Sequence, residues 1–335
     1  MNQAFTPPAR KIRANAGPVR QGQVDMLNLQ PLPRWTGLVG SGRPADPSAS
    51  AFAAGATLLA LDSLMRANPP WLGTFAMRQA LASASAAAKL LRYREDAAAL
   101  RDAVNLARPG DDFGPAGRLL HALQVWAGRS LRLDAASLAP LADHLGLALP
   151  ASLFDGLALR EKFHHPVAAA AGAAAYAATM LGGQLSPEAE VFALIVADMV
   201  LAASLGWAKP LPLLLSAAAH PALKNPATGH RSRPGEADWA QACHAACALA
   251  GGEAHARALD LARRAGALGA VAGQVRSKGG AKGIAAILAS DCVSVASLDG
   301  HFGSERAARR FLDRLSELGG IRELTQRKTF RLYGL

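Results

Sequence analysis

Alanine-rich stretches fill the middle of the chain and restrict the kind of fold that it can adopt. The stretch from Pro166 to Gln184, for example, carries no charge and consists mostly of alanine and glycine. Alanine has the highest helix propensity of all residues and is scarce in strands. Because only 5% of the residues are aromatic while 51% are hydrophobic, small side chains must build much of the core. We therefore predict an all-α fold with closely packed helices.

Start and stop signals divide the region after residue 50 into consecutive helices. Ser186-Pro187-Glu188 combines a capping serine, a proline at the first helical position and an acid in the first turn. Pro69-Pro70 ends the first helix. The predicted helices cover 51–67, 72–94, 95–107, a helix opened by Pro115, 134–145, 151–165, 167–181, 186–206, 236–250 and 253–275.

The 335 residues divide into three predicted regions. Residues 1–48 are rich in proline, glycine and basic residues and are expected to form a basic flexible arm. Residues 49–277 form the helical body, and Lys278-Gly279-Gly280 is a hinge before a C-terminal domain over 281–335. No apolar stretch resembles a secretory signal, and three cysteines are typical of a reducing compartment. We therefore expect a cytoplasmic protein, with Pro166–Gln184 and Val191–Leu205 as buried core helices rather than membrane spans.

The charge balance indicates the class of partner. The formal net charge is +11 and the sequence pI is about 10.2, which favours a polyanion, nucleic acid first. Residues 281–335 contain nine Lys/Arg and six Asp/Glu, a net charge of +3. This excess is modest, so the placement of the basic residues carries more weight than their number.

The pattern over 281–335 is that of a winged helix, three helices followed by a β-hairpin. Helices are predicted over 282–289 and 293–298, followed by a turn over 299–303. A third helix begins after Ser304, which is placed to cap it. Beyond Gly319-Gly320, two arms, 321–324 and 329–333, enclose a basic turn, and Phe330 is expected on the same side as Leu332.

The third helix separates apolar from basic residues. Ala308, Phe311, Leu312, Leu315 and Leu318 share one face by their spacing. Arginines lie away from this stripe, and further basic residues follow in the hairpin. A helix able to enter the major groove beside a basic hairpin is typical of a reader of duplex DNA. The predicted DNA-binding residues are Arg306, Arg309 and Arg310 on the helix, with Arg327, Lys328 and Arg331 on the hairpin.

Three segments together resemble one bacterial family. They are NLARPGDDFGPAGRLLHALQVWA, ADMVLAASLGWAKPLPLLL and the tail SERAARRFLDRLSELGGIRELTQRKTFRLYGL. This family is catalogued as domain of unknown function fourteen-oh-three and occurs largely in alpha-proteobacteria. The resemblance covers nearly the whole chain but implies no activity. The tail also resembles winged-helix ends of other alpha-proteobacterial families, including relatives of the Fic proteins, which by analogy favours a DNA-associated regulatory or replicon-maintenance protein.

Two alternatives remain open at this point. In one, the C-terminal domain docks a partner protein or forms a homodimer without binding DNA. In the other, Asp111 and Asp112, in the turn Pro109–Gly114, converge with Asp198 to form a polar pocket of a small-ligand sensor or enzyme. The simpler explanation is that Asp112 caps the next helix and Asp111 suits the turn.

Other patterns fall short of catalytic or metal chemistry. His220-Pro221 begins like a Fic motif, but Lys224 replaces the metal-binding acid and the glycines are missing. Glu161 and His164 have the spacing of a carboxylate-metal site without a second copy. Cys243, His244 and Cys247 share a helix but match no zinc spacing. We therefore predict no catalytic residue, no metal and no cofactor.

Overall fold

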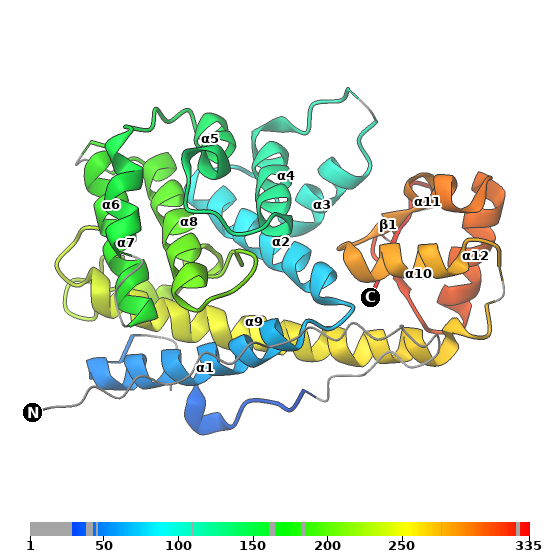
Figure 1. Ribbon diagram of the computed structural model, residues 1–335, viewed down its shortest axis with the longest axis horizontal. Helices are drawn as coiled ribbons and strands as arrows, with labels where there is room; N and C mark the ends of the chain where they lie inside the picture. Colours follow the sequence, from blue (N-terminus) through cyan, green and yellow to red (C-terminus); the bar gives the residue numbers. More distant parts are fainter. Residues whose placement is uncertain are drawn as a thin grey trace, which may run out of the picture.

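The computed structural model describes residues 29–37, 43–44, 46–108, 110–160, 165–182, 185–275, 277–325 and 329–335. Within these ranges lie twelve α-helices, three short 3-10 helices and one small sheet of three strands (Figure 1). The prediction of an all-α fold is confirmed. The helices of the body are α1 (Pro47–Ala67), α2 (Leu72–Leu90), α3 (Ala97–Asn105), α4 (Gly114–Gly128), α5 (Ala135–His144), α6 (Ser152–Arg160), α7 (Pro166–Met180), α8 (Pro187–Ser204) and α9 (Trp239–Ala272).

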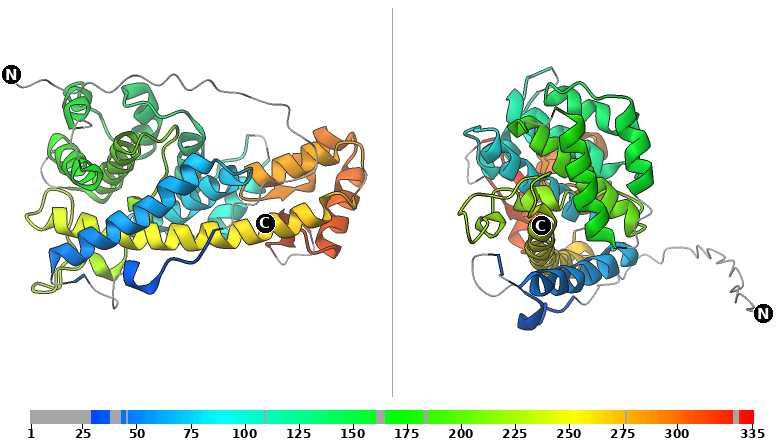
Figure 2. Two further views of the ribbon diagram at one scale, coloured as in Figure 1. Left: turned by 60° about the horizontal axis from the view of Figure 1, so that its bottom comes forward. Right: turned by 90° about the vertical axis from the view of Figure 1, so that its left-hand side faces the viewer.

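The longest helix, α9, corrects one prediction. It contains 34 residues without interruption, where two helices separated at Gly251-Gly252 were expected. Gly251 stays inside the helix because α1 approaches it closely: a Cβ built on it would lie 2.6 Å from Oγ1 of Thr57. A glycine within a helix costs about 1 kcal/mol of stability. The close packing of α1 against α9 offsets this cost, and the two helices lie side by side along much of their length (Figures 1 and 2).

Helix α8 forms the centre of the body. Fourteen consecutive residues from Ala189 to Ala202 are buried, so the helix is covered on all sides, as its predominantly apolar sequence requires. Alanines of α7 provide one wall, and Trp239 of α9 donates its indole N–H to the carbonyl oxygen of Ala171 at 3.0 Å. The alanine-rich stretch Pro166–Gln184 is therefore a packed core helix over its described part.

Of the described helices, only α1 is long and apolar enough to cross a membrane. In the structure it packs along α9, and Leu58, Leu61 and Leu64 on its inner face are buried. This packing is that of an amphipathic core helix.

The N-terminal region predicted as a flexible arm lies mostly outside the described residues. One described residue of it, Arg43, is buried and forms a 2.7 Å ion pair with Asp238. The Arg43 guanidinium also donates to the Ser232 hydroxyl. This part of the predicted arm is thus fastened to the body.

The C-terminal unit follows α9. Its elements are α10 (Gly280–Ala289), β1 (Val293–Ser294), α11 (Val295–Phe302), α12 (Glu305–Glu317), β2 (Arg322–Glu323) and β3 (Leu332–Gly334). The strands form an antiparallel sheet in the order β1-β3-β2, with Val293 opposite Tyr333 and Arg322 opposite Gly334. Two predictions were wrong here: Val293–Ser294 is a strand rather than the start of a helix, and the predicted turn over 299–303 is helical as far as Phe302.

Candidate functional site

Helix α12 presents a sharply divided surface. Ser304 caps it as predicted, because its hydroxyl accepts the backbone N–H of Ala307. Ala308, Phe311, Leu312 and Leu315 are buried in the unit, whereas the arginines on the rest of the helix are exposed. The exposed arginines are Arg306, Arg309, Arg310 and Arg314. The structure thus places the three predicted helix residues together on the outside of the molecule.

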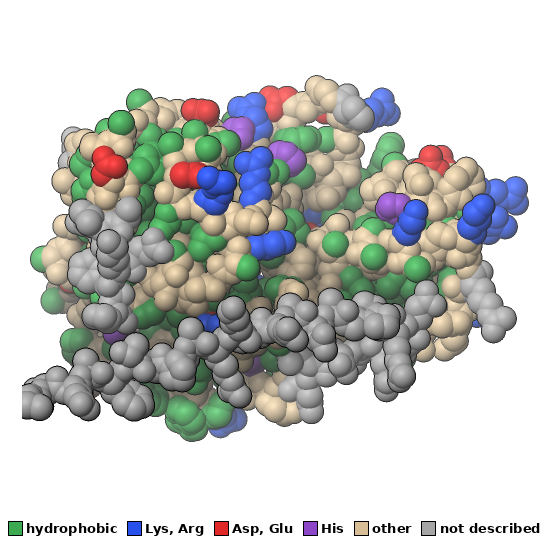
Figure 3. Space-filling view, viewed as in Figure 1, with side chains coloured by type: hydrophobic (Ala, Val, Ile, Leu, Met, Phe, Trp, Pro, Cys, Tyr) green, Lys and Arg blue, Asp and Glu red, His purple; other side chains and the backbone are tan. Residues whose placement is uncertain are grey.

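The position of α12 leaves this surface open. The helix lies at one end of the molecule, and in two views no other described helix or strand lies beyond it (Figures 1 and 2). Lys and Arg side chains gather over the same end in the space-filling view (Figure 3). Among the described residues, the ion pairs of Arg309 and Arg314 stay within the helix: Arg309 with Glu305 at 3.5 Å and Arg314 with Glu317 at 3.2 Å. Such exposed pairs contribute at most about 1 kcal/mol, so the guanidinium groups are available to an external anion.

The hairpin adds Arg331 to this end, whereas its other described basic residue, Arg322, lies near Arg78 and Arg264. Arg331 is exposed and lies 3.5 Å from Glu323 across the strand pair. A hydrogen bond to Tyr333 and the charge of Glu323 raise its pKa above the ordinary value of an arginine. The predicted contact residues Arg327 and Lys328 lie outside the described residues.

Phe330 departs from its predicted place. It was expected beside Leu332 on the inner side, but its side chain is 66% exposed while Leu332 is fully buried. Its backbone has φ +55°, the left-handed region, which breaks the alternation of the strand just before β3 begins. An exposed aromatic ring therefore stands next to Arg331, a feature that simple strand alternation misses.

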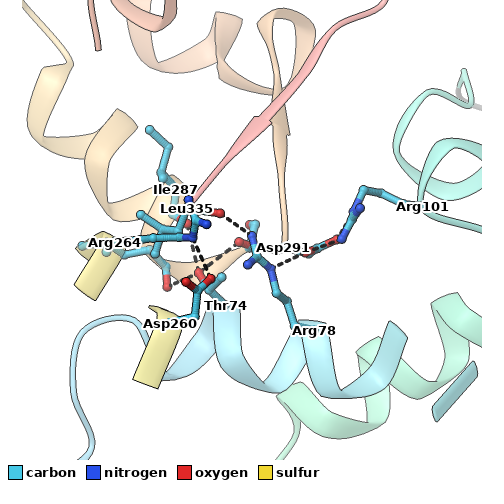
Figure 4. Close-up of polar contacts among 10 residues, drawn as sticks. Thr74, Arg78, Arg101, Asp260, Arg264, Ile287, Asp291 and Leu335 are labelled. Carbon is cyan, nitrogen blue, oxygen red and sulfur yellow. Dashed lines mark hydrogen bonds and ion pairs between the residues drawn. The ribbon is translucent and has the colours of Figure 1, made fainter. Parts of the chain in front are cut away.

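An ion-pair cluster joins the unit to the body (Figure 4). The carboxylate of Asp291, between α10 and β1, accepts hydrogen bonds from Nε of Arg78 at 2.9 Å and from Nε of Arg101 at 2.5 Å. Arg78 comes from α2 and also donates to the carbonyl oxygen of Leu335, at 2.7 Å. The side chain of Asp291 is only 3% exposed, so both guanidinium groups compensate a nearly buried charge. Because 190 and 213 residues separate these partners in sequence, no local pattern could have identified them.

Backbone contacts reinforce this junction. The hydroxyl of Thr74 lies 2.8 Å from the carbonyl oxygen of Leu288, at the end of α10. Gly320 packs so closely on α9 that a Cβ on it would meet the Val271 side chain at 2.6 Å. The C-terminal unit is therefore seated on both α2 and α9.

The predicted carboxylate pocket of the body does not form. Asp111 and Asp112 are exposed; Asp111 accepts the backbone N–H of Arg108, and Asp112 pairs with Arg118 at 2.8 Å. Asp112 also accepts the N–H of Gly114, at the start of α4. Asp198, in contrast, is fully enclosed in α8, and its oxygens accept the N–H groups of Leu214 and Leu215. These are turn and core contacts, and the N-cap of α4 is Phe113 rather than Asp112. The alternative in which the three carboxylates converge was therefore wrong.

Burial has a clear effect on Asp198. It raises the pKa of this carboxyl to about 8, although the backbone N–H groups of residues 213–215 act in the opposite direction. The neighbouring thiols of Cys243 and Cys247 are buried as well, and their hydrogen bond together with burial raises the pKa of Cys247.

Metal and Fic-type chemistry find no support among the described residues. No group of three or more His, Cys, Asp or Glu side chains there is arranged to hold a metal ion. His220 uses Nδ1 to accept the N–H of Ala222 and so begins a short 3-10 helix. Glu161 and His164, the predicted carboxylate–histidine pair, lie outside the described residues.

These features define a predominantly helical protein that carries a small helix-and-hairpin unit at its C-terminal end. The chain belongs to the family described as protein of unknown function (DUF1403), whose sequence model matches residues 21–335. The family resemblance read from the three sequence segments is thereby confirmed. No curated protein and no solved structure matches the chain.

Proposed function

We propose that residues 281–335 form a winged helix that binds duplex DNA, within a cytoplasmic regulatory or replicon-maintenance protein. The order of elements supports this proposal. Three helices precede a hairpin, β1 lies between the first two helices, and β3 is the central strand of the sheet. In this arrangement the third helix, α12, has the position of a recognition helix.

The dimensions of α12 suit the major groove. Thirteen residues at 1.5 Å per residue give a helix of about 20 Å, and the groove is about 12 Å wide. Arg306, Arg309 and Arg310 are spaced i, i+3 and i+4, so they point to one side. Arginine is the side chain best suited to bidentate contacts with guanine and to phosphate.

The hairpin supplies a second point of contact. Arg331 stands beside the strand pair and can reach a phosphate next to the groove that α12 enters. Its partner Glu323 is 3.5 Å away, a distance typical of a weak pair that a phosphate can replace.

One observation carries the proposal: the arginines of α12 point to solvent, opposite a fully buried apolar stripe, at an end of the molecule that no described element covers. A helix needed only for packing does not require a row of exposed arginines whose ion pairs, among the described residues, are weak and lie within the helix. The bundle would also be expected to cover such a face if it served only as an internal contact.

Fluorescence anisotropy with a labelled duplex of about 25 base pairs tests this function. We expect binding at low salt, and a fall in log K with log salt of about 0.9 per phosphate neutralised. Replacing Arg309 and Arg310 together by alanine should weaken binding at least tenfold, since each lost contact with base or phosphate contributes about 1 kcal/mol or more.

The matched control removes two exposed arginines of the body, Arg94→Ala plus Arg129→Ala. It lowers the net charge by the same amount and should change affinity much less. Equal weakening in both double variants would mean that only overall charge matters, and absence of any duplex binding at low salt would refute the proposal. A dimer that persists at high salt without DNA binding would instead indicate an interaction module.

A further inference from the structure

A cavity of about 540 Å³ opens in the body beside the attachment of the C-terminal unit. Its walls come from α2, α3, the segment around His220 and α9. This volume falls in the range of small-molecule sites, about 300–1,000 Å³. The charged side chains in its lining are Arg78, Lys89, Arg101, Glu253 and Arg257.

The lining is unusually basic. Four Lys or Arg side chains face one carboxylate, Glu253, which pairs with Arg257 at 2.9 Å. Asp291 and Asp102 lie next to Arg101 and reduce the excess, yet Lys89 is exposed and has no ion pair among the described residues. His220 adds a donor, because its Nδ1 accepts the N–H of Ala222 and the neutral ring then carries its proton on Nε2.

Two further arginines lie near Arg78, outside the lining of the cavity. Arg264 of α9 and Arg322 of β2 lie close enough to Arg78 for their charges to interact. Partial burial, followed by repulsion from Arg264, Arg78 and Arg101, lowers the pKa of Arg322. Asp260, which pairs with Arg264 at 2.7 Å, offsets part of this positive charge. The remaining excess of Lys and Arg in the lining favours a ligand of opposite charge.

We propose that this cavity binds a small molecule with two or more negative charges, held by Arg78, Lys89, Arg101 and Arg257. Carboxylate and phosphate groups share the required chemistry, since both accept paired hydrogen bonds from guanidinium groups. The limited volume favours a small molecule over a polymer. This site goes beyond the proposed function and does not require that the protein bind DNA.

Binding in the cavity has a consequence for the C-terminal unit. Arg78 and Arg101 line the cavity and at the same time hold Asp291 (Figure 4). A bound anion competes with Asp291 for these two guanidinium groups. Occupancy therefore weakens the attachment of β1 and β3 to the body, which hydrogen exchange of the amides in 291–294 and 332–335 would report as faster exchange.

Isothermal titration calorimetry of the full chain, without DNA, tests the site directly. The probes are citrate and inorganic pyrophosphate, with acetate at the same ionic strength as a singly charged control. We expect saturable binding of at least one of the two multivalent probes and none of acetate. A preference for citrate or for pyrophosphate would identify the carboxylate or the phosphate class.

Two variants locate the binding. Lys89→Glu changes an exposed residue and should weaken binding at least tenfold, equivalent to about 1.4 kcal/mol, and Arg257→Gln should do the same from the opposite wall. The control Lys209→Glu makes an identical change of charge at an exposed residue outside the cavity. Absence of saturable binding of both probes, or equal losses with Lys89→Glu and Lys209→Glu, would overturn the inference.

Discussion

The body and the C-terminal unit use charged residues in opposite ways. In the body, some carboxylates are buried or half-buried and paired with arginines. Glu190 is 2% exposed and accepts from Arg231 and Arg233, and the half-buried Asp238 accepts from the buried Arg43. On α12, the arginines project to solvent and meet carboxylates only one turn away. Ion pairs thus hold segments of the body together, whereas the arginines of α12 remain accessible to a partner.

The junction between the regions belongs to the first type. Asp291 is part of the C-terminal unit by sequence, but its contacts are those of an enclosed body carboxylate. The difference is therefore between buried, paired charges and exposed charges, whichever region they belong to. Substitutions at each kind of position can test it.

The largest effect is expected at the junction. Asp291→Ala leaves Arg78 and Arg101 partly buried without their shared carboxylate, and breaking such a pair costs about 3–5 kcal/mol. Because both arginines keep some solvent contact, we expect a loss of about 3 kcal/mol in the free energy of unfolding by urea. The control Asp260→Ala removes a more exposed carboxylate, 34% exposed and also paired with two arginines, and should cost about 1 kcal/mol or less. Equal losses would erase the distinction between enclosed and surface charge.

A smaller effect is expected where α1 crosses α9. Gly251→Ala places a Cβ 2.6 Å from Oγ1 of Thr57, and overpacking of this kind costs about 1–3 kcal/mol. Gly252→Ala, one residue on, meets nothing within 4 Å and should stabilise by up to about 1 kcal/mol through helix propensity. Thermal unfolding should shift in opposite directions for the two variants. A shift in the same direction would show that α1 is not seated on α9 as described.

The smallest effect concerns pH and the carboxyl of Asp198. Its pKa is raised to about 8 in the folded protein, against about 3.9 in an unfolded chain. The folded state therefore holds a proton that the unfolded state has lost, and the associated stability is present below pH 4 and lost as pH rises to 8. Between pH 6 and pH 7 this group should remove about 1 kcal/mol from the free energy of unfolding.

Comparison with Asp198→Asn isolates that contribution, because the variant cannot titrate there. Urea unfolding at pH 6 and pH 7 should show a flatter pH dependence than in the unmodified protein. Asp143→Asn, at an exposed position, should leave the dependence unchanged. An unchanged slope in Asp198→Asn would mean that the enclosed carboxyl is already ionised.

Signals confined to a few neighbouring residues predicted much of the fold. Caps such as Ser186 and Ser304, the end of α1 before Pro69 and the buried stripe of α12 as far as Leu315 were found as expected, whereas Leu318 follows the helix and is half-buried. The prediction failed where a distant segment decides the local structure. Gly251 reads as a helix break until α1 is placed against it, and the two-residue strand Val293–Ser294 is too short to show alternation.

The candidate site was predictable to a similar degree. The outward direction of Arg306, Arg309 and Arg310 follows from helical periodicity alone. Phe330 was misplaced because its left-handed backbone conformation interrupts the alternation that a strand would have. The cavity and Asp291 were not anticipated, since their side chains come from segments roughly two hundred residues apart.

Because α9 is uninterrupted, its length helps to fix the orientation of α12 relative to the body. The C-terminal unit contacts the body at two separate places: Gly320 packs on the end of α9, and Asp291 pairs with Arg78 of α2. Both contacts can form only if α9 and α2 present them in the right relative orientation. One residue inserted upstream of Leu268 would rotate the first contact by about 100° and advance it about 1.5 Å relative to the second. The number of residues in α9 between Trp239 and Val271 therefore fixes the direction in which the exposed arginines of α12 point.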